Sequence, residues 1–149
     1  MPNSFNISNC FLDEVGKDAA AAFQRLGYPH TNLENWRFTN TSLLKETDFT
    51  KSSTREEPCP ILGHRFENMF RIVLANGMFD PGQSDVVNGV MATSLYKVVS
   101  ETPEMLKPYL GKVADFHSHP FLAQNTAEFV DGVYLRIPKS MVVESPIHI

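Results

Sequence analysis

Residues 9–26 carry hydrophobic side chains three or four positions apart, with polar side chains between them. This spacing puts the hydrophobic positions on one face of an α-helix. Gly27 then permits the left-handed backbone that ends helices, and Pro29 prevents the helix from resuming. The sequence therefore predicts an amphipathic helix over residues 9–26, and alanines 19–22 suggest that another element approaches it closely. Its hydrophobic face comprises Phe11, Val15, Ala19, Phe23 and Leu26.

Residues 30–60 are mostly polar and contain many turn-forming residues. Trp36 is the side chain that we expect to anchor this region. Residues 48–60 contain almost no hydrophobic side chains. We therefore predict a surface loop there.

The pattern changes at residues 71–75, which are rich in β-branched and other strand-forming side chains. Asn76-Gly77 follows directly, and this pair tolerates the positive φ angles of a tight hairpin turn. Residues 80–82 and 88–89 contain further turn sequences, the second leading into residues 90–92. These signals predict short strands joined by tight turns.

Two further helical regions are expected in the second half of the chain. Residues 94–110 have hydrophobic positions with helical spacing, and Thr102-Pro103-Glu104 is a helix-start signature inside them. We therefore expect two pieces there, ended by Gly111. Another short helix should begin near Pro120, with hydrophobic side chains facing inward. Its inward-facing positions are Phe121, Leu122 and Phe129.

The C-terminal residues return to the two-residue period of a strand. Residues 133–137, 142–144 and 147–149 are each expected to be strands, separated by turns. They could form the first coil of a β-solenoid. Alternatively, they could close a small sheet with residues 71–75. Both arrangements give an α+β fold.

Composition and charge narrow the classes of function. The chain has 149 residues, 42% of them hydrophobic and 20% charged, as expected for one globular domain. The 13 basic and 17 acidic side chains give a net charge of -4, which makes nucleic acid an unsuitable main ligand. The hydrophobic runs are too short to cross a membrane, and the N-terminus lacks the pattern of a secretory signal. We therefore expect a cytoplasmic protein.

His117 and His119 form the cluster that most resembles a ligand set for a metal ion. Gly111, the His-Ser-His sequence and Gln124 partly match the first metal motif of cupin barrels, in which imidazoles bind a divalent ion. Against this, Pro120 favours a helix start, Gln124 replaces the usual Glu, and the second cupin motif is missing after Gln124. An exposed pair of loop histidines is the simpler interpretation.

Cys10 and Cys59 are the other candidates for reactivity or metal binding. Cys10 would lie in the first helical turn, where the helix dipole lowers the pKa of a thiol. Most single cysteines are small core residues, however. Trp36 and Arg37 similarly fit either a stacked or acid-paired cluster or, more simply, a core tryptophan beside a surface arginine. The residues alone thus predict a non-enzymatic α+β domain.

Several short motifs occur in an order that is similar to one known family. Residues 23–29 read FQRLGYP, and residues 34–39 read ENWRFT. An NG…F…S…GV…L series spans residues 75–95, and residues 121–127 read FLAQNTA. Residues 131–149 contain DGVYL, IPK and PIHI. Together, these motifs resemble the N-terminal region of SufD, in the SufB/SufD family of the SUF iron–sulfur cluster assembly machinery.

The resemblance implies a scaffold role. In this family an N-terminal helical region leads into a long right-handed parallel β-helix, and later regions contact SufB- and SufC-like proteins. Residues 1–130 would be the helical and mixed region, and residues 131–149 would begin the β-helix, all as one structural unit. Interior positions of its first coil would be Leu135, Ile137, Val142 and Ile147.

The resemblance carries over no catalytic, cofactor-binding or metal-binding residue, because the matching positions are turns, caps and first strands. The main hypothesis is therefore an N-terminal fragment of a SufD-like scaffold, with no enzymatic activity of its own. Its β-helix would end open after Ile149, so we also expect self-association through residues 133–149. The alternatives are a small cupin-like enzyme that uses His117 and His119, and an unrelated interaction module.

Overall fold

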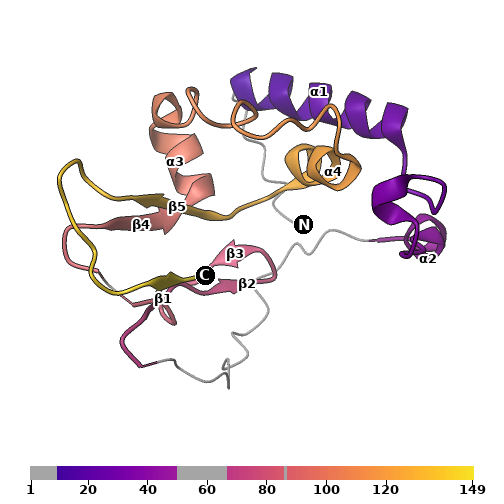
Figure 1. The fold of residues 1–149 in the computed structure, drawn as a ribbon. Coiled ribbons are helices and arrows are strands. Elements are labelled where there is room, and N and C mark those ends of the chain that lie inside the picture. The colour runs from indigo at the N-terminus through magenta and orange to yellow at the C-terminus, as the bar shows by residue number, and fades with distance from the viewer. Residues whose placement is uncertain (1–9, 50–66, 86) are drawn as a thin grey trace. The chain divides into compact units, whose positions relative to one another are not determined.

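The computed structural model describes residues 10–49, 67–85 and 87–149. These residues form two compact units, each built from separate stretches of the chain. The helical unit consists of residues 10–49 and 106–129, and the strand unit consists of residues 67–85, 87–105 and 130–149 (Figure 1).

The helical unit contains the long helix predicted from the N-terminal hydrophobic stripe. Gly27 ends this helix with a φ of +64°, and its N–H donates to the carbonyl oxygen of Phe23 at 2.7 Å. The helix predicted near Pro120 is also present. A short helix after Asn40 was not predicted. The elements are α1 (Cys10–Leu26), the 3-10 helix η1 (Glu34–Trp36), α2 (Ser42–Glu46) and α4 (Pro120–Glu128).

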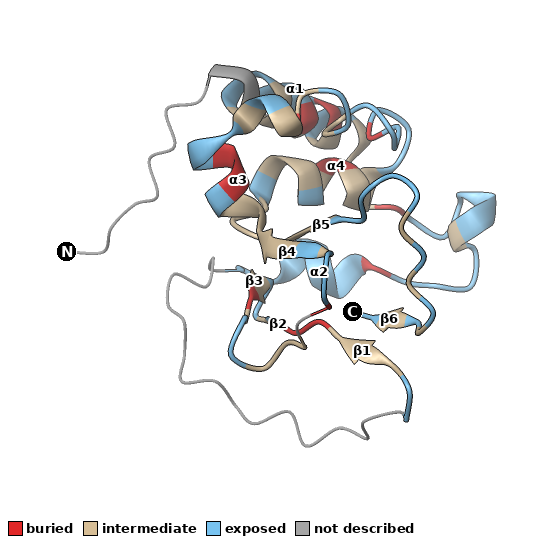
Figure 2. Ribbon diagram, turned by 90° about the vertical axis from the view of Figure 1, so that its left-hand side faces the viewer, coloured by how far each residue is buried: buried red, intermediate tan, exposed pale blue. Residues whose placement is uncertain are grey.

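Small side chains form the core of this unit, where α1 packs against α4 (Figure 2). Ala19 and Ala123 are fully buried, and Ala22 and Phe116 are 4% and 5% exposed. Because alanine is short, the two helices can approach each other closely, which confirms the expectation from alanines 19–22. Partly buried side chains surround this core: Val15, Phe23, Leu122 and Ala127.

Aromatic side chains attach the segment after α1 to α4. The Trp36 ring lies 5.2 Å from that of Phe121, and the Tyr28 ring lies 6.1 Å from it, both edge-on. The buried Thr41 hydroxyl donates to the carbonyl oxygen of Pro29. Trp36 is therefore an anchor, as predicted. The predicted surface loop at residues 48–60 lies mostly outside the described residues.

The strand unit contains six short strands and two helical segments. The first helical piece predicted within residues 94–110 is present as an α-helix, whereas the second is a 3-10 helix of only three residues, followed by turns from residue 106 to Gly111. Buried side chains of this unit are Ile72, Val73, Phe79, Val87, Val98 and Val99. The elements are β1 (Phe70–Arg71), β2 (Leu74–Ala75), β3 (Met78–Phe79), β4 (Met91–Ser94), α3 (Leu95–Glu101), η2 (Pro103–Met105), β5 (Val133–Arg136) and β6 (Ile147–His148).

The strands pair two by two. β2 and β3 form an antiparallel hairpin, and β4 pairs antiparallel with β5. β1 and β6 run parallel, with Phe70 opposite Ile147 (Figure 1). A C-terminal strand therefore does close a small sheet with the region of residues 70–75, as one of the two arrangements requires. The β-helix itself stays a prediction.

The prediction of a strand at residues 142–144 is wrong. Ser140 has a φ of +67°, which turns the chain, and Val142 is 81% exposed. The segment pairs with none of the described strands. Of the four expected interior positions, Ile137 and Val142 are exposed in this chain, whereas Leu135 and Ile147 are partly buried.

The predicted turns are confirmed, and each uses the residue types that favour it. Asn76 and Gly77 have φ angles of +50° and +79°, as a tight hairpin between β2 and β3 requires. The Asp80 carboxylate accepts hydrogen bonds from the backbone N–H groups of Gly82 and Gln83. These turns lie at residues 76–77, 80–82 and 88–89.

Asp131 connects three elements of the strand unit. Its Oδ1 accepts from the Ser94 hydroxyl at 2.7 Å and from the Tyr96 N–H at 3.0 Å, at the start of α3. Its Oδ2 accepts from the Phe79 N–H of β3 at 3.1 Å. Ser94 is also the N-cap of α3 and accepts from the Lys97 N–H. One carboxylate thus fixes the positions of β3, β4 and α3.

Within residues 10–49, 67–85 and 87–149, every helix is too short or too polar to cross a membrane.

Candidate functional site

The predicted histidine pair lies in the helical unit, in the turns that lead into α4. His117 Nε2 is 3.4 Å from Asp18 Oδ2 on α1, and both side chains are more than half exposed. The carbonyl oxygen of His117 accepts a hydrogen bond from Arg25 Nη2 at 3.0 Å. His119 is the exposed N-cap residue of α4. The structure therefore uses His117 to attach this turn to α1.

The geometry does not complete a cupin-like ligand set. The His-Ser-His sequence lies in turns, whereas the cupin motif would put both imidazoles on one strand. Within the described residues, no group of three or more His, Cys, Asp or Glu side chains could hold a metal ion. The expected helix start at Pro120 is present instead.

The carboxylate of Asp115 stabilises the same turn through hydrogen bonds to two of its residues. Asp115 Oδ1 accepts from the His117 N–H at 3.0 Å, and Oδ2 accepts from the Ser118 hydroxyl at 2.7 Å. The Ser118 hydrogen bond and then the His117 N–H lower the pKa of Asp115 below its ordinary value, because both favour the charged form. Asp115 is fully exposed, so burial does not drive this shift.

A groove borders this turn, and we call it the α1 groove. It encloses about 340 Å³ between α1 and the chain around residues 110–117. Its floor is apolar, and its edges carry charged side chains. The lining residues are Glu14, Val15, Asp18, Leu110, Gly111, Lys112, Phe116 and His117.

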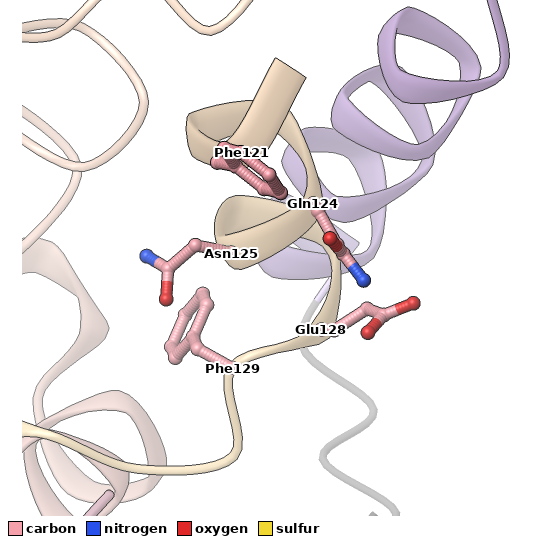
Figure 3. A pocket seen from close by; sticks show the side chains of 5 residues that line it. All are labelled: Phe121, Gln124, Asn125, Glu128 and Phe129. Atoms are coloured by element: carbon pink, nitrogen blue, oxygen red, sulfur yellow. The ribbon is translucent and has the colours of Figure 1, made fainter. Parts of the chain in front are cut away.

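A second groove of about 300 Å³ follows α4 and is called the α4 groove. In Figure 3, Asn125 and Phe129 lie on one side of the helix, and Gln124 and Glu128 lie on the other. Phe121 completes the lining. Gln124 Nε2 also lies 3.4 Å from the Tyr28 hydroxyl. Both grooves are open features of the surface of the helical unit.

The remaining candidates from the sequence are the two cysteines and the Trp36-Arg37 pair. Cys10 begins α1, but its side chain lies outside the described residues, as does all of Cys59. The Arg37 guanidinium lies 4.6 Å from the centre of the exposed Phe38 ring, and its Nη1 is 3.6 Å from Glu34. Arg37 is a surface residue, as the simpler interpretation expected, and it pairs with an acid, as the alternative expected. Trp36 is only partly buried, so the expected core tryptophan is not confirmed.

The sequence analysis missed Asp18, Asp115 and Asp131 as organising residues. The role of Asp115 could have been predicted, because an Asp side chain often accepts a hydrogen bond from the backbone N–H two residues later, which forms an Asx turn. The partner of Asp18 is 99 positions away, and the partners of Asp131 are 35 to 52 positions away. No local pattern could identify their partners.

Comparison with known proteins gives the family. The family model described as the SufBD protein N-terminal region matches residues 5–149. An iron–sulfur cluster assembly SufBD family protein of Synechocystis is 29% identical over 137 residues, which cover 88% of this chain and 30% of the relative. A chloroplastic SufBD family protein of Arabidopsis thaliana is 35% identical over 136 residues, covering 91% of this chain and 20% of the relative.

The chain thus spans less than a third of the length of either relative. No solved structure is significantly similar to it. The resemblance to the SufB/SufD family noted in the sequence motifs is confirmed by the family model, which covers those motifs from end to end. The chain belongs to the SufBD family, whose N-terminal region it matches over nearly its whole length.

Proposed function

We propose that this chain is the N-terminal part of a scaffold subunit that acts in iron–sulfur cluster assembly. The single observation that carries this proposal is the match of the family model over residues 5–149. The names of the Synechocystis and Arabidopsis relatives describe the same process. Within the family, we assign the chain to the SufD branch because of the ENWRFT motif at residues 34–39.

The role that we assign to this part is binding and support. Charged side chains shape the surface of the helical unit, such as Asp115 within its turn and Asp18 on α1, which contacts His117. The two grooves of the helical unit give that surface places for side chains of other proteins. The partners of the complete protein would be SufB- and SufC-like subunits, and no chemistry is assigned to the region itself.

A genetic experiment tests the function. The complete reading frame containing this chain should restore cluster-dependent enzyme activity in cells that lack their own SufBD subunit. A frame lacking residues 10–129 should not restore it, because the helical unit and most of the strand unit would be missing. Restoration of SufD-deficient cells but not SufB-deficient cells would support the SufD assignment. Failure in both would overturn the proposal.

We also propose that residues 133–149 begin a β-helix. β1 and β6 run parallel, as the strands of a β-helix do, whereas β5 pairs antiparallel with β4. The apolar side chains that residues 133–149 leave exposed, Ile137, Val142 and Ile149, would be covered by further strands. Purified 149-residue chain should then self-associate through this edge in sedimentation experiments. A clean monomer at high concentration, with β5 and β6 ordered, would count against it.

The compartment is part of the same proposal. The sequence pattern predicts a cytoplasmic protein, whereas the Arabidopsis relative is named as chloroplastic. Imaging of the complete, fluorescently tagged protein in its own cells would distinguish these compartments.

A further inference from the structure

The α1 groove differs from an ordinary surface depression because two parts of the chain meet closely to form it. Gly111 has a φ of +72°, and a Cβ at this position would lie only 2.9 Å from Val15 Cγ1. The turn therefore sits directly on α1. Phe116, which is 5% exposed, supports the floor from the core of the unit. The floor is thus held in place by packing.

The edges of this groove carry opposite charges. Glu14 and Asp18 are four residues apart on α1, which places them on one side of the helix. Lys112 lies on the turn that forms another part of the lining. A partner would therefore meet an acidic edge along α1, an apolar floor at Val15 and a basic edge at Lys112.

We propose that the α1 groove binds a segment of a partner protein that places an aliphatic side chain between a basic and an acidic one. The aliphatic side chain lies on Val15, the basic one contacts Asp18, and the acidic one contacts Lys112. Charge complementarity supports this occupant, and the groove volume of about 340 Å³ is near the lower limit of ligand pockets, which suits a few side chains. This assignment rests on the binding role proposed above and names its surface.

His117 gives the acidic edge a fixed geometry. Its imidazole lies 3.4 Å from Asp18, and the Asp115 and Arg25 contacts hold the backbone of His117 in place. The Asp18 side chain remains 59% exposed beside this contact. A basic partner side chain can therefore approach Asp18 without displacing the turn.

The test uses the full 149-residue chain and two synthetic peptides. The first peptide carries Leu between Arg and Glu, and the second has both charged residues replaced by Gln. Binding is measured by NMR titration of the Val15 methyl groups. The charged peptide should shift these signals and bind more tightly than the Gln peptide. Asp18→Asn should weaken the charged peptide about two- to fivefold and leave the Gln peptide unchanged.

Glu128→Gln is the matched control, because Glu128 lines the α4 groove instead (Figure 3). It should change neither affinity. The inference is overturned if Val15 does not respond, if both peptides bind equally, or if Glu128→Gln weakens binding as Asp18→Asn does. These measurements need no assembly partner. The peptide inference can therefore be overturned while the genetic experiment supports the proposed function, and the proposed function can be overturned while the peptide still binds.

Discussion

The two units of this chain are stabilised in different ways. In the helical unit, alanines on α1 and α4 are fully or almost fully buried against each other and Phe116. In the strand unit, carboxylates and hydroxyls bind backbone N–H groups that the two-stranded ladders leave unpaired. Examples are Ser84 with the Val73 N–H at 2.9 Å and Asp85 with the Arg71 N–H at 2.8 Å.

This difference follows from the length of the elements. A helix such as α1, with 17 residues, pairs its own backbone and needs only a complementary face. Strands of two to four residues satisfy few backbone groups by pairing, so side chains must supply the remaining acceptors. Packing changes should therefore damage the helical unit most, and loss of an acceptor should damage the strand unit most.

The largest effect is expected at Asp131. Asp131→Ala removes the acceptor of two backbone N–H groups and one hydroxyl, and should destabilise the strand unit by about 3 kcal/mol. Asp131→Asn keeps one carbonyl oxygen and should cost less. Hydrogen exchange measured residue by residue should show lost protection in β3 and α3. Equal loss of protection in α1 and α4 would mean that the two units unfold together and that the comparison fails.

The matching test in the helical unit is Ala19→Leu. Ala19 is completely buried, so the added side chain must push the helices apart at a cost of about 2 kcal/mol. Ala21→Leu is the control, because Ala21 is exposed on the same helix. Thermal unfolding followed by circular dichroism should show a lower midpoint for Ala19→Leu alone. Equal midpoints for the two variants would mean that the alanine packing is not tight.

These two sites also show how far sequence can predict this fold. The face of α1 follows from hydrophobic spacing, and the hairpin at Asn76-Gly77 follows from local backbone preference, so both were predictable. Asp131 contacts Phe79, which is 52 positions away, and nothing local marks that pair. The strand expected at residues 142–144 failed for a related reason. Strand-forming residues need a partner strand, and Val142 has none among the described strands.

The candidate site was predictable to a similar degree. His117 was identified from its residue type, but its partner Asp18 is 99 positions away, on α1. The grooves depend on tertiary packing and have no sequence signal of their own. The motifs predicted the family correctly because they are recognised by residue type and by spacing along the chain. Neither property depends on knowing which residues touch in the folded protein.

Two glycines, one in each unit, allow a comparison in which the expected loss of stability is smaller. Gly77 and Gly111 both have positive φ angles, at +79° and +72°, so alanine costs about 1 kcal/mol at either position from backbone strain. A Cβ on Gly77 would meet open space, whereas one on Gly111 would strike Val15 at 2.9 Å. Gly111→Ala should therefore lose about 1 kcal/mol more in denaturant unfolding. Equal losses would show that the turn moves freely away from α1.

The smallest effect on stability is expected at Asp115, which uses the same chemistry as Asp131 but lies fully exposed. Its lowered pKa means that its contribution is present above pH 3.8, the ordinary pKa, and is lost as the pH falls through the lower folded value. Ser118→Ala removes the largest cause, so the Asp115 pKa measured by carboxyl-carbon NMR should rise toward 3.8. Ser118→Thr keeps the hydroxyl and should keep the shift. Because solvent screens an exposed carboxylate, the unfolding midpoint at neutral pH should stay nearly unchanged. A large drop of the midpoint would mean that an exposed acceptor such as Asp115 stabilises its unit as strongly as the partly buried Asp131 does.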